Sequence, residues 1–260
     1  MKEYIIDNTS DRIRYHDLPG EEMPVLFIHG LGCASSFDYP EVVAQDSLKN
    51  HRCILVDLLG AGYSDKPEAF EYTVEAHARY LKEFIEYLNL GSFVLFGHSL
   101  GGAVALALAD KLRNRIHKIV LSEPNLDKSA EGSTSKYIAN FELQDFTNRG
   151  FHKLIQVSRE RGNQIWAASL SVCLPESVYL ISKSAAAGGD PSWREILYSF
   201  QCSKTLIFGE TSLPDPDVPL LKKQGIHIEI VKNAGHSMAW ENPRGLASAI
   251  YNGINLENER

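Results

Sequence analysis

A serine flanked by glycines is the residue whose setting most directly suggests chemistry. Gly97-His98-Ser99-Leu100-Gly101 fits the pattern G-x-S-x-G, and it lies between an apolar run typical of a strand, Phe93 to Phe96, and an Ala- and Leu-rich run typical of a helix, Gly102 to Leu112. The glycines permit a sharp turn from strand to helix that strains the serine and lifts its hydroxyl out of the sheet. Backbone N–H groups at the helix N-terminus can stabilise a developing anion. We therefore expect Ser99 to be a nucleophile.

Eight short apolar runs, each bounded by turn residues, are predicted to be the strands that position this turn. The first two are joined through Asn8-Thr9-Ser10-Asp11, a composition that favours a hairpin. The inner runs are nearly continuous Val, Ile, Leu and Phe, which is typical of parallel strands covered on both faces. The runs are Lys2 to Asp7, Arg12 to Asp17, Val25 to His29, Arg52 to Asp57, Phe93 to His98, Lys118 to Ser122, Thr205 to Gly209 and Ile226 to Val231.

Helical patterns separate the later strands. Between Val74 and Leu88, apolar residues recur in steps of four and three, so one stripe faces the sheet while charged residues face water. The run Leu100 to Leu112 is almost wholly apolar and suits a central buried helix. A further helix is predicted after Asn242-Pro243, because proline is favoured at a helix start. Strands that alternate with helices predict a doubly wound, mostly parallel α/β sheet of eight strands with flanking helices.

The alternation breaks between about Asp127 and Pro191, where helix-like pieces occur without a convincing strand. The interval far exceeds the ~2 to 6 residues usual for a loop between a helix and a strand. We predict one core domain made of residues 1–126 and 191–260, with a helical cap, residues 127–190, inserted above the sheet. The predicted cap helices are Tyr137 to Asn148, Phe151 to Arg161 and Pro175 to Ser184.

The composition favours a soluble protein and argues against several classes of partner. With 260 residues, 44% of them hydrophobic, and a formal net charge of -7, the chain can bury a core but lacks the basic surface that attracts nucleic acid or an anionic membrane. No hydrophobic signal core follows the N-terminus, and the four cysteines lack C-x-x-C spacing, so free thiols and a cytoplasmic location are expected. No metal-ligand motif or complete nucleotide-binding loop is found, so no metal or other cofactor is expected.

Three further segments, together with the Ser99 turn and the helical insertion, resemble the α/β-hydrolase superfamily, specifically its small members with a helical cap after the sixth strand. His29-Gly30-Leu31-Gly32 is similar to the family's oxyanion segment, and Asp57 to Ser64 is similar to its D-x-x-G-x-G-x-S loop. Gly235-His236-Ser237 is similar to its catalytic-histidine loop. These features cover almost the whole length of the chain.

The resemblance implies a role for each matching position. Ser99 corresponds to the nucleophile, His236 to the general base, and the backbone N–H groups of Leu31 and Leu100 to the oxyanion hole. A base is needed because a serine hydroxyl is a weak nucleophile at neutral pH, and imidazole titrates in the right range. The serine argues against the subfamilies that use an aspartate at this position, the haloalkane dehalogenases and epoxide hydrolases.

The acid that should orient His236 departs from the family's usual pattern. The family usually places an aspartate after the seventh strand in a G-x-x-D arrangement, whereas Gly209-Glu210-Thr211-Ser212 has a serine there. Glu123 directly follows the sixth strand, and it is the predicted acid because some members of the superfamily carry their acid at that strand end. Asp215 and Asp217 stay open as alternatives, since a longer loop would return either one to the site. A third alternative is that no acidic residue orients His236.

The substrate pocket is predicted to combine residues next to the motifs with an aromatic residue of the cap. Cys33 lies two positions beyond Leu31, although a small buried thiol is the plainer interpretation. His29 and His98 are expected to hydrogen-bond the backbone and fix the loops. The predicted pocket residues are Gly30, His98, Cys33, Trp166 and Met238.

The predicted function is that of a serine hydrolase acting by two-step acyl transfer. A cap that closes over a pocket favours a small, partly apolar substrate, and hydrolysis of a carboxylic ester is the first choice. Carbon–carbon bond, lactone or amide hydrolysis and perhydrolysis use the same residues. A ligand receptor or signalling partner that retains the fold is the rival from another class, and an inactive member is a third alternative, because fold does not determine function.

Overall fold

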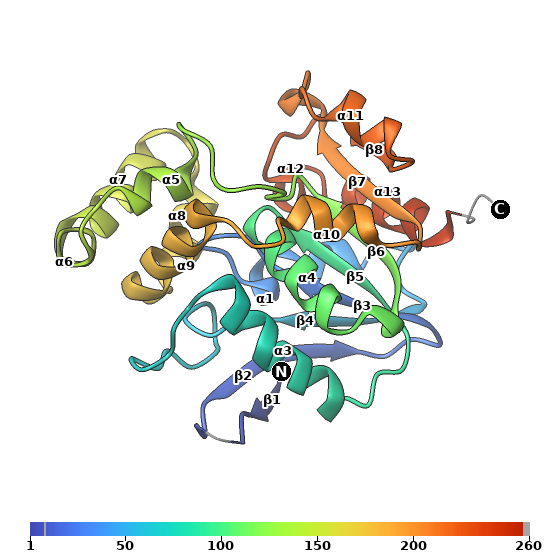
Figure 1. Cartoon of the computed structure of the whole chain (residues 1–260), viewed down its shortest axis with the longest axis horizontal. Helices are drawn as coiled ribbons and strands as arrows, with labels where there is room; N and C mark the ends of the chain where they lie inside the picture. Colours follow the sequence, from blue (N-terminus) through green and yellow to red (C-terminus); the bar gives the residue numbers. More distant parts are fainter. Residues whose placement is uncertain (8, 257–260) are drawn as a thin grey trace.

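Eight strands form one sheet in the computed structural model, which describes residues 1–7 and 9–256. The strand order is β1-β2-β4-β3-β5-β6-β7-β8, with β2 antiparallel to β1 and β4 and the other neighbours parallel (Figure 1). The prediction of a mostly parallel eight-stranded sheet is confirmed, as is pairing of the first two strands, although Asn8 of their turn lies outside the described residues. The strands are β1 (Lys2–Ile5), β2 (Arg12–Leu18), β3 (Glu22–Ile28), β4 (His51–Val56), β5 (Phe93–His98), β6 (Ile116–Ser122), β7 (Lys204–Gly209) and β8 (His227–Val231).

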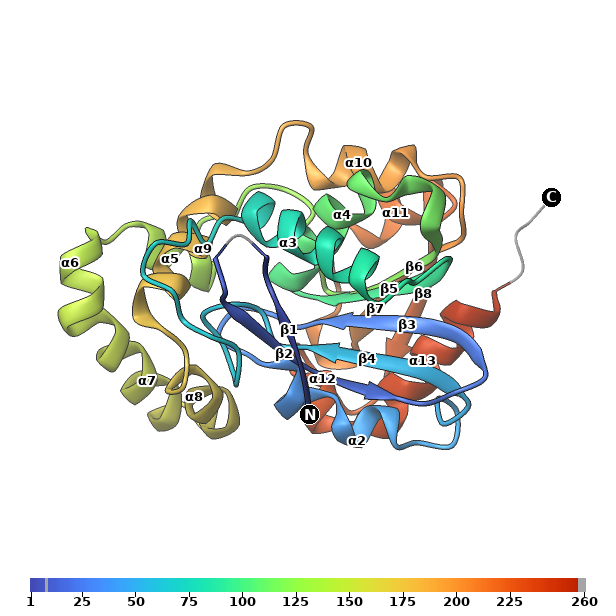
Figure 2. The same cartoon turned by 90° about the horizontal axis from the view of Figure 1, so that it is seen from below.

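Helices cover both faces of this sheet. They are α1 (Ser35–Asp38), α2 (Pro40–Val43), α3 (Val74–Tyr87), α4 (Leu100–Lys111), α10 (Trp193–Ser199), α11 (Val218–Lys223), α12 (Met238–Glu241) and α13 (Pro243–Asn255). Figure 2 shows α3, α4, α10 and α11 on one side of the sheet and α2, α12 and α13 on the other. Side chains alternate along each strand, so on β3 Leu26 and Ile28 join one apolar core while Val25 and Phe27 join the other.

Local sequence explains where the longer helices begin. The Thr73 side chain accepts a hydrogen bond from the Ala76 N–H at 3.0 Å and caps α3. Asn242 caps α13 in the same way, accepting from the Gly245 N–H at 2.8 Å. The predicted central helix is α4, and all of its residues from Leu100 to Ala109 are buried, which its small Ala and Gly side chains permit.

Residues 127–190, called the helical segment from here on, gather beside the carboxyl ends of the parallel strands (Figures 1 and 2). They contain α5 (Thr134–Ala139), α6 (Leu143–Asp145), a π-helical turn (Phe146–Gly150), α7 (Phe151–Glu160), α8 (Gln164–Leu170) and α9 (Pro175–Ala187). These helices share an apolar cluster that includes Ile138, Phe146, Leu170 and Tyr179.

The prediction of one continuous helix over Tyr137 to Asn148 is wrong. The α5 helix ends at Ala139, and Glu142 adopts an extended conformation with φ of -77° and ψ of 148° before α6 begins. The Tyr179 hydroxyl donates to the Phe141 carbonyl at 2.9 Å, so a tertiary hydrogen bond satisfies this interruption. The separate helix α8 was not predicted either, because seven residues carry too little periodicity.

Two observations bear on how the chain meets its surroundings. Within residues 1–7 and 9–256, no single helix has the length and apolar composition needed to cross a membrane. Only α8 and α9 taken together have that length and composition, and the two helices are separated by a bend of 107°. The four cysteine thiols are free, with Cys33, Cys53 and Cys173 buried and Cys202 partly exposed.

Candidate active site

Ser99 occupies the strained turn that its glycine-flanked setting predicts. The residue lies between β5 and α4 with φ of 51° and ψ of -124°, a backbone conformation that side-chain-bearing residues rarely adopt. Its N–H donates to the Ser122 carbonyl at 2.9 Å, and its carbonyl accepts from the N–H groups of Gly102 at 2.9 Å and Asn125 at 3.0 Å. These bonds hold the strain in place, as is common at reactive residues.

The glycines around Ser99 are required by close backbone approach. A Cβ on Gly97 would lie 2.8 Å from the Gly101 carbonyl oxygen, and a Cβ on Gly101 would lie 2.2 Å from the carbonyl oxygen of His29. No side chain fits at either place without moving the backbone. The turn therefore packs directly against the loop that follows β3.

His236 and Glu123 form a hydrogen-bonded pair at the carboxyl ends of β8 and β6. The Nδ1 of His236 lies 2.6 Å from Oε2 of Glu123, and the Gly209 N–H donates to the other carboxylate oxygen at 2.8 Å. Glu123 has a φ of 39°, and its own N–H donates to the Ile207 carbonyl at 3.0 Å. With Nδ1–H donated to the carboxylate, Nε2 of His236 is left to accept a proton.

The carboxyl group of Glu123 is held in its ionised form. Burial acts to raise the pKa of Glu123, but the hydrogen bonds from His236 and from the Gly209 N–H outweigh it, so the pKa lies below its usual value. The hydroxyl of Ser212 contributes in the same direction. Ser212 occupies the position where the resembled family usually has its acid, and here its side chain supports the carboxylate that comes from the neighbouring strand.

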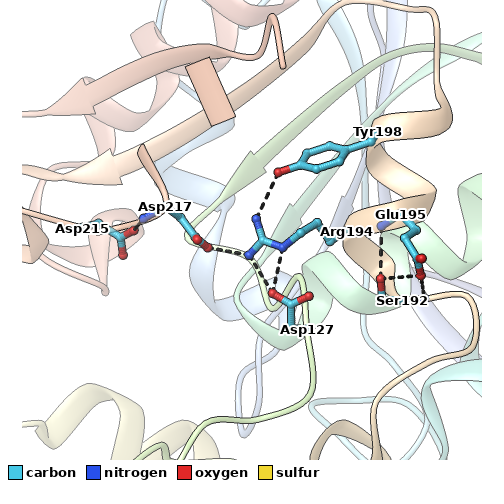
Figure 3. Close-up of polar contacts among 7 residues, drawn as sticks. All are labelled: Asp127, Ser192, Arg194, Glu195, Tyr198, Asp215 and Asp217. Carbon is cyan, nitrogen blue, oxygen red and sulfur yellow. Dashed lines mark hydrogen bonds and ion pairs between the residues drawn. The ribbon is translucent and has the colours of Figure 1, made fainter. Parts of the chain in front are cut away.

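Asp215 and Asp217 belong to a different cluster, shown in Figure 3. Asp217 Oδ2 accepts from Arg194 Nη2 at 2.6 Å, and the Asp217 N–H donates to Asp215 Oδ1 at 2.8 Å. Arg194 also donates to Asp127 at 2.6 Å and to the Tyr198 hydroxyl at 3.2 Å. The structure therefore brings Glu123 to the imidazole of His236, while Arg194 of α10 joins Asp127 at the start of the helical segment to Asp217 in the loop before α11.

One cavity of about 320 Å³ lies between the sheet edge and the helical segment, and every site residue predicted from the sequence except the two aspartates lines it. Those residues are Ser99, His236, Glu123, Leu31, Leu100, Gly30, His98, Cys33, Trp166 and Met238. Other polar or aromatic lining residues carry no motif signal: Asp38, Tyr39, Asn125, Ser133, Thr134, Ser135, Asn163 and Trp240. Only the fold brings this second group to the cavity.

The segment around Leu31 is tied to the helical segment. The Trp166 indole N–H donates to the Leu31 carbonyl at 2.8 Å. Gly32 has a φ of 68°, and a Cβ there would lie 2.7 Å from Leu170 Cδ1, so glycine lets α8 approach this loop closely. The backbone N–H of Leu100 lies in the first turn of α4, where N–H groups have no intrahelical partner.

Two further histidines near the site hydrogen-bond the backbone. His29 Nε2 accepts from the Leu58 N–H at 3.0 Å, so its Nδ1–H donates to the Gly30 carbonyl at 2.9 Å. His98 Nδ1 lies 3.2 Å from the Ser122 carbonyl oxygen and 2.9 Å from the Ser122 hydroxyl, and its ring centre lies 4.7 Å from that of His236. Burial, reinforced by the neighbouring His236, lowers the pKa of His98 to about 3, so its ring is uncharged at neutral pH.

The described part of the chain contains no group of three or more His, Cys, Asp or Glu side chains arranged to hold a metal ion. The arrangement that it does contain is a strained serine, a carboxylate-paired imidazole and backbone N–H groups around one cavity. Such a set can transfer an acyl group through a serine ester.

Comparison with known proteins gives the family. Residues 23–167 match the family model described as alpha/beta hydrolase fold. Haloalkane dehalogenase 2 of Mycobacterium tuberculosis is 34% identical over 116 residues, which are 44% of this chain and 39% of that protein, so the chain spans well under half of that relative's length. Two solved structures align along nearly their whole lengths at low identity, and they show the fold alone. One is an N-acyl homoserine lactonase mutant complexed with N-hexanoyl homoserine, with a TM-score of 0.75 and 19% identity over 100% of this chain and 99% of that one. The other is an esterase from Exiguobacterium antarcticum, with a TM-score of 0.77 and 18% identity over 96% of this chain and 97% of that one.

The family model covers more than half of the chain, and the mostly parallel eight-stranded sheet with flanking helices agrees with it. The chain therefore belongs to the alpha/beta hydrolase fold family.

Proposed function

We propose that the chain is a serine hydrolase that cleaves a carboxylic ester of a small, partly apolar compound by two-step acyl transfer. The observation that carries the proposal is the hydrogen bond between His236 and Glu123 inside the cavity that the strained Ser99 also lines. The match to haloalkane dehalogenase 2 covers less than half of either chain, and Ser99 stands where dehalogenases of the resembled superfamily use aspartate. A serine nucleophile is better suited to attack the carbonyl carbon of an ester or related acyl compound than to displace a halide from a carbon–halogen bond.

In the first step, Nε2 of His236 takes the proton of the Ser99 hydroxyl while the serine oxygen forms a bond to the substrate carbonyl carbon. The carbonyl oxygen becomes an oxyanion, which the N–H groups of Leu31 and Leu100 bind. His236 then gives its proton to the departing alcohol, and an acyl-serine remains. His236 then takes a proton from water, whose oxygen bonds to the acyl carbon, and gives that proton to the serine oxygen as the acyl–serine bond breaks, which releases the carboxylic acid and the free serine.

Two side chains flank the ring of His236. The ionised Glu123 lies on its Nδ1 side, and the ring of the adjacent His98 is uncharged. The side chain of His236 is 54% exposed, which leaves the hydrolytic water a route to it.

The helical segment is proposed to act as the cap of this site. Trp166 of α8 lines the cavity and hydrogen-bonds the Leu31 loop, so the segment contributes both a wall and a contact to the reacting end of the substrate. A small compound fits such a covered cavity better than a polymer. A cytoplasmic location and the lack of nucleic-acid, membrane and cofactor partners stay predictions from composition.

A series of p-nitrophenyl esters with acyl chains of two to twelve carbons tests the proposal. We expect turnover to peak at short or medium chains, since the cavity measures about 320 Å³. Lactones, amides and carbon–carbon substrates that use the same groups form a second panel. Ligand binding detected by a thermal shift, with no turnover of any panel member and a copurifying protein, would instead favour the receptor alternative.

A further inference from the structure

A second group of polar side chains lines the Ser99 cavity and takes no part in the proposed acyl transfer. Asp38 ends α1, Tyr39 follows it, and Trp240 lies on α12, just after the loop that carries His236. These residues come from the loops after β3 and β8, which are distant in sequence. The fold thus brings a carboxyl, a phenol and an indole to one end of the same cavity.

The polar atoms of this group complete no hydrogen bond of normal geometry, although the Cys33 thiol and the Trp240 indole lie close enough to the Asp38 carboxyl to lower its pKa. Asp38 is 4% exposed and Tyr39 1% exposed. Asp38 Oδ1, the Tyr39 hydroxyl and Trp240 Nε1 are all enclosed, yet none completes a hydrogen bond with any part of the chain that the structure describes. Buried polar groups of this kind weaken a fold unless something satisfies them, so three in one place call for a function.

The carboxyl of Asp38 is uncharged at neutral pH. Burial raises the pKa of Asp38 to about 8, against the lowering effects of the nearby Cys33 thiol and Trp240 indole. The charge of Asp57 raises it further. An uncharged carboxyl both accepts and donates a hydrogen bond, while an indole N–H only donates.

We propose that Asp38, Tyr39 and Trp240 form a polar subsite that binds an uncharged part of the substrate carrying both a hydrogen-bond donor and an acceptor, namely a hydroxyl or a secondary amide. The Trp240 N–H donates to the acceptor, and Asp38 Oδ1 accepts from the donor. The inference rests on the proposed function, because it assigns the subsite to the substrate of Ser99. A charged substrate group is disfavoured there, since burial already keeps Asp38 neutral.

Three ligands of similar size distinguish the contribution of a hydrogen-bond donor to binding from that of an acceptor. N-Butylacetamide and 2-heptanol carry both, whereas 2-heptanone carries only the acceptor. Their dissociation constants are measured by calorimetry on Ser99→Ala, in which no serine can add to the ketone. The same measurements are made after adding Asp38→Leu, Asp38→Asn or Trp240→Phe to Ser99→Ala.

We expect Asp38→Leu to reduce the preference for the amide and the alcohol over the ketone at least 5-fold. Asp38→Asn, which keeps an acceptor and a donor, should retain that preference. Trp240→Phe should weaken all three ligands, because each uses its acceptor. An unchanged ketone-to-amide ratio in Asp38→Leu, or unchanged affinities of all three ligands in Trp240→Phe, would overturn the subsite.

A stability measurement separates a binding role from a structural one. Replacing an unpartnered buried carboxyl by a side chain of similar size should leave the melting temperature of Asp38→Leu equal to or above that of Ser99→Ala, and a large fall would show that Asp38 holds the fold instead. The binding assay needs no turnover. A donor preference that persists in a protein inactive toward every ester therefore supports the subsite and rejects the acyl-transfer mechanism.

Discussion

The sheet edge and the helical segment build opposite walls of one cavity by different means. Ser99 and Glu123 directly follow β5 and β6, where backbone hydrogen bonds fix both residues, and His236 lies in the loop after β8, where the Glu123 carboxylate holds its ring. The helical segment contributes Trp166 and a set of small polar side chains through helices that have an apolar cluster of their own. The comparison indicates that the sheet edge carries the reactive groups of the proposed mechanism, while the helical segment encloses the cavity from the other side.

The strongest way to break this comparison is to remove the nucleophile. Ser99→Ala should lower kcat/KM for the best p-nitrophenyl ester by about 10³-fold or more, because no other hydroxyl occupies the strained turn. The melting temperature should change little. Activity that survives in a folded Ser99→Ala protein would take the reaction away from the sheet edge.

The choice of acid is tested by matched amide substitutions. Glu123→Gln should lower kcat by about 10²-fold or more, because the imidazolium loses its charged partner and its preferred tautomer. Asp217→Asn, which alters the Arg194 cluster, should change kcat by less than about 2-fold. A larger loss from Asp217→Asn than from Glu123→Gln would reverse the assignment.

Loss of the hydrogen bond between the two walls of the cavity should reduce kcat/KM less than the two changes above. Trp166→Phe removes the indole N–H that bonds the Leu31 carbonyl, and a neutral hydrogen bond is worth about 1 kcal/mol, so kcat/KM should fall about 5-fold. Tyr179→Phe is the matched control, because it removes one hydrogen bond within the helical segment and leaves the cavity lining intact. Equal losses from both variants would show that the effect is loosening of the segment rather than loss of the Leu31 contact.

The pKa of Glu123 predicts the smallest effect, on stability. Its pKa is lowered in the folded protein, so its ionised form stabilises the fold above the unfolded-state pKa of about 4.3, and that contribution disappears as pH falls through the lower, folded-state value. Urea unfolding at pH 7 and pH 3 should show a larger acid-induced loss of stability in the wild type than in Glu123→Gln. Parallel losses would indicate that the His236 contact does not favour the carboxylate.

The strand pattern and the glycine-flanked serine were predictable because they are local. The apolar runs match the eight strands to within a few residues, and the glycine at 97 is required by a contact within the turn itself. The broken helix around Phe141 was not predictable, because a hydrogen bond from Tyr179, far along the chain, completes it. Asp38 likewise belongs to no motif, and only the fold brings it close to Trp240 at the cavity.

By itself, the order of residues determined the alternation of strands and helices and the strained serine turn, since each depends on short-range pattern and backbone sterics. The role of the distant histidine loop was implied by the family resemblance instead. The tertiary structure decided which carboxylate serves His236 and which polar groups surround the substrate. Glu123 reaches the imidazole because β6 and β8 flank β7 in the sheet, whereas Arg194 holds Asp217 elsewhere. Such choices depend on distances between loops, and those distances exist only after the sheet has formed.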